Sequence, residues 1–527
     1  MAVSSSGGFS RRALLRGAGT AGIGIGGAAL LGTGAAAPLP ASASAARRAV
    51  GAAPPEWHPS TGSWAGPNYD LANTRRVTHT SINSDSVARL RVKWRFPLSG
   101  TGFFGGFSSN PIVVRGVVYI IDLQSIVYAL DQQSGKVLWQ RSFDSVNIGP
   151  NGVAYGYGLL FGTTHAGVFA LDPATGNTVW SRELTSSAVG GVDIAPQLYD
   201  GKVVVSTVPS ALDQYTPGAM GMVSVFDART GAVIWEFNTV KDGELWGDPT
   251  LNSGGGLWYP PAVDKAGRIF LSVCNPAPFP GTTQFPNGTS RPGPNLYSNS
   301  LVALDSETGK LLWYYQVAPH DIRDYDLQIS AIITEAVVEG VLTEIVVVAG
   351  KMGYVYAFRA HDGKKLWQLE VGIHQNDTGP LPDNTIIVFP GTFGGVETPM
   401  ALSEGRVFVP WVDAGMPASS TSYDIPDLTQ GKGGILAADV ATGWVCWKRD
   451  LPQMALGAAT VAKDVVFTSD FSGAIYALDT RTGRTLWTDQ ARAGINSFPA
   501  VCGDMLFVGA GTPQSSDSVP ELIAYSL

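Results

Sequence analysis

The feature that most constrains the fold is a short motif, D-x-x-x-G-x-x-x-W, which recurs along the 527-residue chain. Six copies keep all three residues. Their tryptophans are Trp139, Trp180, Trp235, Trp313, Trp447 and Trp487. A seventh copy keeps Gly363 and Trp367 but has Arg359 in place of the aspartate. Such self-similarity indicates a repeat architecture in which each copy marks one structural unit.

Each copy is typical of a hairpin, as in YALDQQSGKVLW at 128–139. The alternating apolar run predicts a strand with one buried face. Asp131 then opens a tight turn by accepting backbone N–H bonds, and Gly135 supplies the positive φ that the turn needs. The returning strand ends in Trp139. A tryptophan that recurs at one position in every sheet is expected to pack between neighbouring sheets.

The spacing of the tryptophans predicts the fold class. They recur at intervals of about 40 to 80 residues, and about forty residues make one four-stranded propeller blade. At the chain ends, LIAY (522–525) is similar to the first half of the motif and LRVKW (90–94) to the second half. We therefore predict an all-β, eight-bladed β-propeller of four-stranded blades, closed by pairing of the N- and C-terminal strands. The alternative, an open stack of blades with unrelated ends, would expose sheet edges.

The N-terminus predicts export. Residues 10–16, SRRALLR, form a twin-arginine pattern, which is followed by a Gly/Ala-rich run and two A-x-A cleavage sites at 41–45. We expect a twin-arginine signal peptide over 1–45, an N-terminal extended segment over 46–88, and the propeller over 89–527. The mature protein would then be periplasmic or extracellular. The alternative for the first segment is a disordered low-complexity tail.

Composition excludes several classes of partner. The net charge is −8, and a uniformly acidic protein does not track a phosphate backbone, so we expect no nucleic-acid partner. No stretch after the signal peptide approaches the ~18 apolar residues of a membrane helix, so no transmembrane segment is expected in the mature chain. The three cysteines lie far apart, and an odd number implies no disulfide framework.

Charged residues gather just after the fourth complete motif, in the segment PHDIRDYD (319–326). If this segment is an extended strand, Asp324 and Asp326 point the same way and repel each other unless a cation or a proton joins them. A hard cation with oxygen ligands would join the two carboxylates, and the side-chain amide oxygen of Asn275 is a candidate ligand. A carboxylate beside a metal can also act as a base toward an alcohol. The alternative is a solvated acidic turn in which Arg323 pairs with an aspartate.

Two further residues stand out from the repeat. Trp258 follows three glycines, and its indole could stack on a flat ring system at the mouth of the propeller channel. The alternative for Trp258 is ordinary packing under a loop. Lys351 lies next to two glycines at a strand start, where it could bond an oxygen of a bound ligand or be a surface lysine on a turn.

The repeat, the stretch NPAPFPG (275–281) and the pattern P-H-D-x-x-D-Y-D together resemble the pyrroloquinoline quinone (PQQ)-dependent alcohol dehydrogenases, over about residues 57–527. This resemblance implies oxidation of a small-molecule alcohol, with hydride passing to PQQ. Asp324 would be the base, and Asn275, Asp324 and Asp326 would bind a metal. The metal is usually calcium, and Asp326 matches the additional carboxylate of lanthanide-using members.

The resemblance also implies a cofactor site in which Trp258 stacks on PQQ while Lys351 and Thr163 contact it. Two family positions differ: a glutamate metal ligand falls on Thr216, with Asp213 nearby, and a PQQ-binding arginine falls on Asn151. No haem domain is appended, so a separate electron acceptor is implied. The differences leave a second hypothesis, a non-catalytic PQQ-repeat propeller that acts as a binding or assembly scaffold.

Overall fold

The structure is a computed structural model, and it describes residues 56, 59, 61–98, 105–185, 190–211, 214–425 and 427–527. The predicted signal peptide and Asp213 lie outside these residues. Within the described part of the chain, no helix is long and apolar enough to cross a membrane. Cys274, Cys446 and Cys502 are free thiols.

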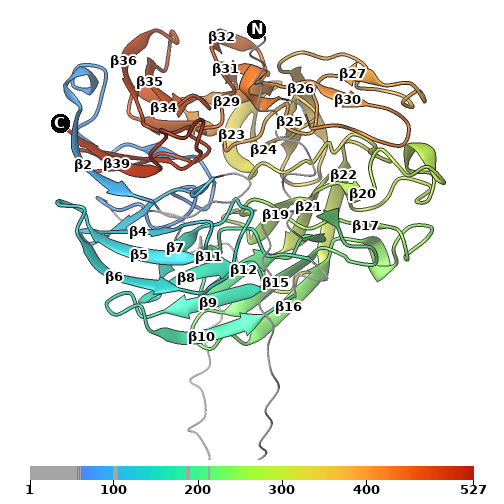
Figure 1. The fold of residues 1–527 in the computed structure, drawn as a ribbon, viewed down its shortest axis with the longest axis horizontal. Helices are drawn as coiled ribbons and strands as arrows, with labels where there is room; N and C mark the ends of the chain where they lie inside the picture. The colour runs from blue at the N-terminus through green and yellow to red at the C-terminus, as the bar shows by residue number, and fades with distance from the viewer. Residues whose placement is uncertain are drawn as a thin grey trace, which may run out of the picture. The chain divides into compact units, whose positions relative to one another are not determined.

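Within the described residues, eight blades of four antiparallel strands follow one another along the chain, and a fifth strand, β1 (Arg76–Val77), is added to the seventh blade (Figure 1). The first four are β3 (Ile112–Val114), β4 (Val117–Ile121), β5 (Ile126–Asp131), β6 (Val137–Ser142); β7 (Val153–Gly156), β8 (Leu159–Thr164), β9 (Gly167–Leu171), β10 (Thr178–Glu183); β11 (Gln197–Tyr199), β12 (Lys202–Ser206), β15 (Met222–Asp227), β16 (Val233–Asn238); and β18 (Ala262–Val263), β19 (Arg268–Ser272), β21 (Ser300–Asp305), β22 (Leu311–Gln316).

The next four blades complete the set. They are β23 (Ile332–Val338), β24 (Val341–Ala349), β25 (Tyr354–Arg359), β26 (Lys365–Glu370); β28 (Ala401–Ser403), β29 (Arg406–Asp413), β31 (Lys432–Asp439), β32 (Val445–Leu451); β33 (Thr460–Ala462), β34 (Val465–Ser469), β35 (Ala474–Asp479), β36 (Thr485–Gln490); and β37 (Ala500–Cys502), β38 (Met505–Ala510), β39 (Glu521–Ser526), β2 (Arg91–Pro97).

The last blade confirms the predicted closure by the two chain ends. Strand β2 pairs antiparallel with β39, and Val92 lies opposite Tyr525. In Figure 1 the blue β2 lies beside the red β39. Strand β2 is the outer strand of this sheet, and the other three strands come from the C-terminal part of the chain. The edge of β39 is therefore paired with β2 and is not left exposed.

The motif residues join each blade to the next. The indole N–H of Trp139 donates to the Pro173 carbonyl at 2.9 Å, and the Cε3 atom of the same ring lies 2.7 Å from where a Cβ on Gly176 would stand. Gly176 also has a φ of +73°, so both the backbone conformation and the neighbouring indole require glycine there. Trp94 makes the equivalent contacts, with Gln132 and Gly135, and is the eighth interblade tryptophan.

The N-terminal segment 64–80 runs along the inner strands of several blades. Strand β1 (Arg76–Val77) pairs parallel with β33, and Trp64 and Thr80 bridge to Val113 and Gly503. Arg75 is fully buried. Its guanidinium donates to Asn68 Oδ1, to Thr460 Oγ1 and to the carbonyls of Pro67, Ala459 and Pro499. The segment therefore ties blades together from the inside of the ring.

Candidate active site

Loops between blades carry the predicted chemistry. Asp324 and Asp326 lie in the loop between β22 and β23, and their side chains are 6% and 0% exposed. Both point at Lys351, in the turn between β24 and β25, whose Nζ lies 2.8 Å from Oδ2 of each aspartate. The three residues therefore converge; the sequence analysis expected the two aspartates to lie together but did not place Lys351 between them.

The route to this convergence differs from the one expected. Asp324 has a φ of +64°, so the segment is not an extended strand, and alternation along a strand does not align the two carboxylates. A left-handed backbone at a non-glycine residue is sparsely populated and costs free energy, and such residues cluster at functional sites.

The predicted alternative, a solvated acidic turn, is wrong. Asp321 is buried, and its carboxylate accepts the backbone N–H groups of Arg323 and Tyr325 at 2.8 and 2.7 Å. The Arg323 guanidinium donates to the backbone carbonyls of 376, 378 and 379. Asp321 therefore shapes the turn and Arg323 fastens it to the neighbouring loop, which leaves Asp324 and Asp326 facing Lys351.

Asn275 joins the cluster through two hydrogen bonds. Its backbone N–H donates to Asp326 Oδ1 at 2.7 Å, and its side-chain Oδ1 accepts from the hydroxyl of Tyr215, in β14 (Gln214–Tyr215), at 2.6 Å. Sequence reasoning missed Tyr215, although it stands directly beside Thr216, the position where the resemblance implies a glutamate. A partly buried phenol therefore bonds the predicted metal ligand in this chain.

The charges of the cluster depend on one another. Burial lowers the pKa of Lys351, but Asp324 and Asp326 outweigh burial and hold that pKa well above its usual value. Burial raises the pKa of Asp324, while the ammonium of Lys351 opposes the rise. The Thr392 hydroxyl also donates to Asp324 Oδ2. A carboxyl group whose pKa is raised is a stronger base, which suits proton abstraction from an alcohol.

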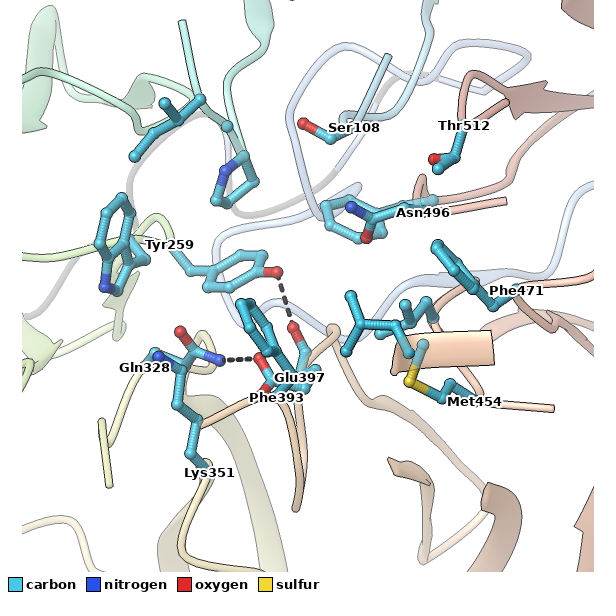
Figure 2. Close-up of a pocket in the computed structure, with 17 residues that line it drawn as sticks. Ser108, Tyr259, Gln328, Lys351, Phe393, Glu397, Met454, Phe471, Asn496 and Thr512 are labelled. Carbon is cyan, nitrogen blue, oxygen red and sulfur yellow. Dashed lines mark hydrogen bonds between the residues drawn. The ribbon is translucent and has the colours of Figure 1, made fainter. Parts of the chain in front are cut away.

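A cavity of about 140 Å³ lies beside this cluster and is lined by Trp258 and Lys351. Trp258 is partly buried. Figure 2 shows Lys351, Gln328 and Glu397 on one side of the cavity and Met454 and Phe471 on the other. The cavity therefore has polar groups next to the aspartates and apolar side chains opposite, and Ser108, Asn496 and Thr512 also line it.

Glu397 is a second residue that sequence reasoning missed. Gln328 Nε2 donates to its Oε2 at 2.7 Å, and the Tyr259 hydroxyl donates to its backbone carbonyl at 2.8 Å. Oε1 is buried and accepts no hydrogen bond from any residue that the structure describes. Burial raises the pKa of Glu397 to about 7, and Lys351 opposes the rise. The available signal was a lone acidic residue within GGVETP, 394–399.

Two positions from the resemblance lie apart from this cluster. Thr163, in β8, is fully buried, does not line the cavity, and donates its hydroxyl to the Ile194 carbonyl at 2.8 Å. Asn151 is also buried and donates to the Asp122 carbonyl at 3.1 Å. Both side chains bond neighbouring backbone and neither lines the cavity, although Asn151 Oδ1 is buried without a hydrogen-bond partner among the described residues.

The oxygen atoms of Asp324, Asp326 and Asn275 are of the kind that binds a hard cation. Asp324 Oδ1 is buried and has no hydrogen-bond partner among the described residues, and two carboxylates share the single ammonium of Lys351. Carboxylate and amide oxygens are the ligands that such cations prefer. Over the described ranges, however, no three His, Cys, Asp or Glu side chains converge on one point. A cation here would use the two aspartates and Asn275.

Comparisons with known protein families match different parts of the chain to two family models. A family model described as the glucose/ethanol/alcohol dehydrogenase β-propeller domain matches residues 187–380, which contain Trp258, Asn275, Asp324, Asp326 and Lys351. A second model, described as the outer membrane protein assembly factor BamB, matches residues 91–216 and 431–526. The dehydrogenase model thus covers the cluster of Asp324, Asp326 and Lys351 but not Glu397, and the other model covers mainly flanking blades.

Similar proteins have been characterised in several bacteria. The quinohemoprotein alcohol dehydrogenase ADH IIB of Pseudomonas putida is 26% identical over 508 residues, which span 83% of this chain and 71% of that protein. The lanthanide-dependent methanol dehydrogenase of Methylacidiphilum fumariolicum (strain SolV) is 25% identical over 522 residues, which span 83% and 82%.

Solved structures share the fold. The quinohemoprotein alcohol dehydrogenase of Comamonas testosteroni superimposes with a TM-score of 0.76 at 20% identity, over 88% of this chain and 80% of that one. The fold is an eight-bladed propeller, and residues 187–380 match the dehydrogenase propeller model. The resemblance to the PQQ-dependent alcohol dehydrogenase family, predicted from the motifs, is confirmed by the family model, the relatives and the solved structures.

Proposed function

We propose that this protein is a quinoprotein dehydrogenase that oxidises an alcohol with PQQ and a bound cation. The observation that carries the proposal is the convergence of Asp324, Asp326 and Lys351 beside a cavity lined by Trp258. An indole can stack on a flat ring, and an ammonium can bond quinone oxygens. Relatives named as quinohemoprotein and lanthanide-dependent dehydrogenases support the same chemistry.

The residues divide the work as follows. PQQ, when bound, supplies the two-electron oxidant that accepts hydride from the carbinol carbon. Asp324 takes the hydroxyl proton, and its base strength is increased by burial. Lys351 holds Asp324 in place and balances its charge. Asn275, Asp324 and Asp326 would hold calcium or a lanthanide. A separate electron acceptor would then reoxidise the cofactor.

The experiment that tests this proposal is reconstitution of the purified protein with PQQ and either calcium or a lanthanide. Reduction of an artificial dye in the presence of an alcohol is expected with one of the two cations. If neither combination reduces the dye with any alcohol in a broad panel, the dehydrogenase proposal is wrong.

The second candidate function is a non-catalytic propeller scaffold. Three observations favour it: Thr163 does not line the cavity, Asn151 does not line it either, and the flanking blades match the BamB model. Comparing PQQ binding by wild type and Trp258→Ala separates the two candidates. Equal weak binding by both proteins supports the scaffold, whereas loss of binding in the variant supports the dehydrogenase.

We also propose that the protein is exported by the twin-arginine route. The supporting observation is the pattern SRRALLR at 10–16. Replacing Arg11 and Arg12 together by lysine keeps the charge but removes the twin arginine. Cell fractionation should then find the precursor retained in the cytoplasm, and unchanged export of the variant would contradict the proposal.

A further inference from the structure

The side of the cavity opposite Lys351 is formed by Leu428, Met454, Leu456 and Phe471, which we call the apolar wall. Leu428 lies in the short helix η5 (Leu428–Gln430), Met454 and Leu456 follow β32, and Phe471 follows β34. These side chains pack together over the buried residues Val412 and Ala414. The wall is thus a continuous apolar surface built from neighbouring blades.

The apolar wall is only partly covered by the protein itself. Met454 is buried, but Leu428, Leu456 and Phe471 keep part of their surface accessible. Apolar surface that remains exposed inside a concave site gains free energy when a ligand covers it. The surface lies in the same cavity as Trp258 and Lys351, so the ligand that covers it would also reach the candidate active site.

Polar side chains line the rest of the cavity: Ser108, Asn496 and Thr512, and a group at the end away from the wall. Lys351, Gln328 and Glu397 lie together there, across from Met454 and Phe471 in Figure 2. A ligand that fits both ends has one polar group and an apolar body. A ligand with hydroxyl groups along its whole length would bury some of them against the wall without hydrogen-bond partners, which is costly.

We infer that the substrate is an alcohol with an apolar body of several carbon atoms, ring-shaped or branched, whose hydroxyl lies at the Lys351 end and whose carbon skeleton covers the apolar wall. This inference rests on the proposed alcohol oxidation. It excludes two other classes as preferred substrates. Methanol is too small to cover the wall, and a polyol such as glycerol places hydroxyl groups against it.

The test compares kcat/KM for benzyl alcohol, methanol and glycerol in the reconstituted protein. One apolar contact is expected to change kcat/KM by a factor of about 10 or more between substrates. The kcat/KM for benzyl alcohol should therefore exceed the values for methanol and glycerol by at least about tenfold. Leu456→Asn keeps the side-chain size but makes the wall polar, and it should lower kcat/KM for benzyl alcohol alone. Leu312→Asn is the matched control, because Leu312 is 50% exposed on the outer strand β22.

Two outcomes overturn the inference. One is a kcat/KM for methanol or glycerol that equals or exceeds the value for benzyl alcohol. The other is an equal effect of Leu456→Asn on all three substrates. Either result leaves alcohol oxidation itself standing, since turnover would still be observed.

A binding measurement covers the case in which no alcohol is oxidised. Benzyl alcohol should raise the thermal stability of the wild-type protein and of Leu312→Asn, and should do so much less for Leu456→Asn. This pattern without turnover would support the apolar ligand class and count against the dehydrogenase proposal. No stabilisation of any of the three proteins would overturn the inference.

Discussion

The ammonium of Lys351 lies 2.8 Å from Oδ2 of Asp324, within a site that is nearly closed to solvent. A neutral replacement leaves Asp324 and Asp326 facing each other without their common counter-ion. We predict that Lys351→Met lowers kcat by about 100-fold or more, because electrostatic groups aimed at a reacting centre typically contribute that much. Steady-state kinetics with the reconstituted protein measure the effect. Lys364→Met, on an exposed turn, is the control and should retain wild-type kcat.

Asp324 is the proposed base, and its amide variant separates proton abstraction from binding. Asp324→Asn keeps the shape of the side chain but removes the basic oxygen. We expect kcat to fall by roughly 10²- to 10⁴-fold, the usual contribution of a general base. PQQ binding should persist, because Trp258 and Lys351 remain. A variant that keeps more than about a tenth of wild-type kcat would contradict the assignment. Asp504→Asn, at an exposed position, controls for loss of one carboxylate.

The repeat made the ring predictable, because each copy of the motif predicts a strand, a tight turn and a tryptophan that packs between blades. It did not reveal that the glycine of one copy lies against the tryptophan of the preceding blade, as Gly231 does against Trp180. That contact depends on the rotation between blades, which is a property of the assembled ring. Trp94 could be predicted as half of a motif because it keeps the tryptophan position although its turn is replaced by a chain end.

The candidate site was predictable only where the chain departs from the repeat. Asp324 and Asp326 stand in a segment rich in charged residues, so sequence pattern alone singles them out, whereas Asn275 stands in the proline-rich stretch NPAPFPG. Glu397 carries no such pattern, and only the packing of its loop against Gln328 brings it to the cavity. Thr163 is a different case, because the hydroxyl that matches a family position donates to the Ile194 carbonyl and does not line the cavity.

Arg75 is expected to be a main support of the closed ring. Its guanidinium joins the N-terminal segment to the loops of two blades through Ala459, Thr460 and Pro499. Arg75→Met leaves several buried acceptors without a donor, which should cost about 3 kcal/mol or more. Denaturant unfolding measures this as a lower midpoint. Arg89→Met, on an exposed residue, should unfold like wild type, and an unchanged midpoint for Arg75→Met would contradict the role.

The raised pKa of Glu397 should make the free energy of unfolding depend on pH. Burial raises its pKa from 4.5 to about 7 in the folded protein, while Lys351 and Gln328 act in the opposite direction. The folded state therefore holds this proton more tightly than the unfolded state, and its contribution to stability is complete below about pH 4.5 and is lost as pH rises through 7.

The glutamine variant isolates this contribution because it cannot titrate. From about pH 4.5 to 7.5, wild type should lose about 3 kcal/mol of unfolding free energy relative to Glu397→Gln, which is what a shift of this size corresponds to. Urea unfolding at several pH values gives the difference directly. The control is Glu404→Gln, at an exposed turn, whose curve should run parallel to that of wild type. Parallel curves for wild type and Glu397→Gln would mean that the carboxyl group of Glu397 is not held protonated by its surroundings.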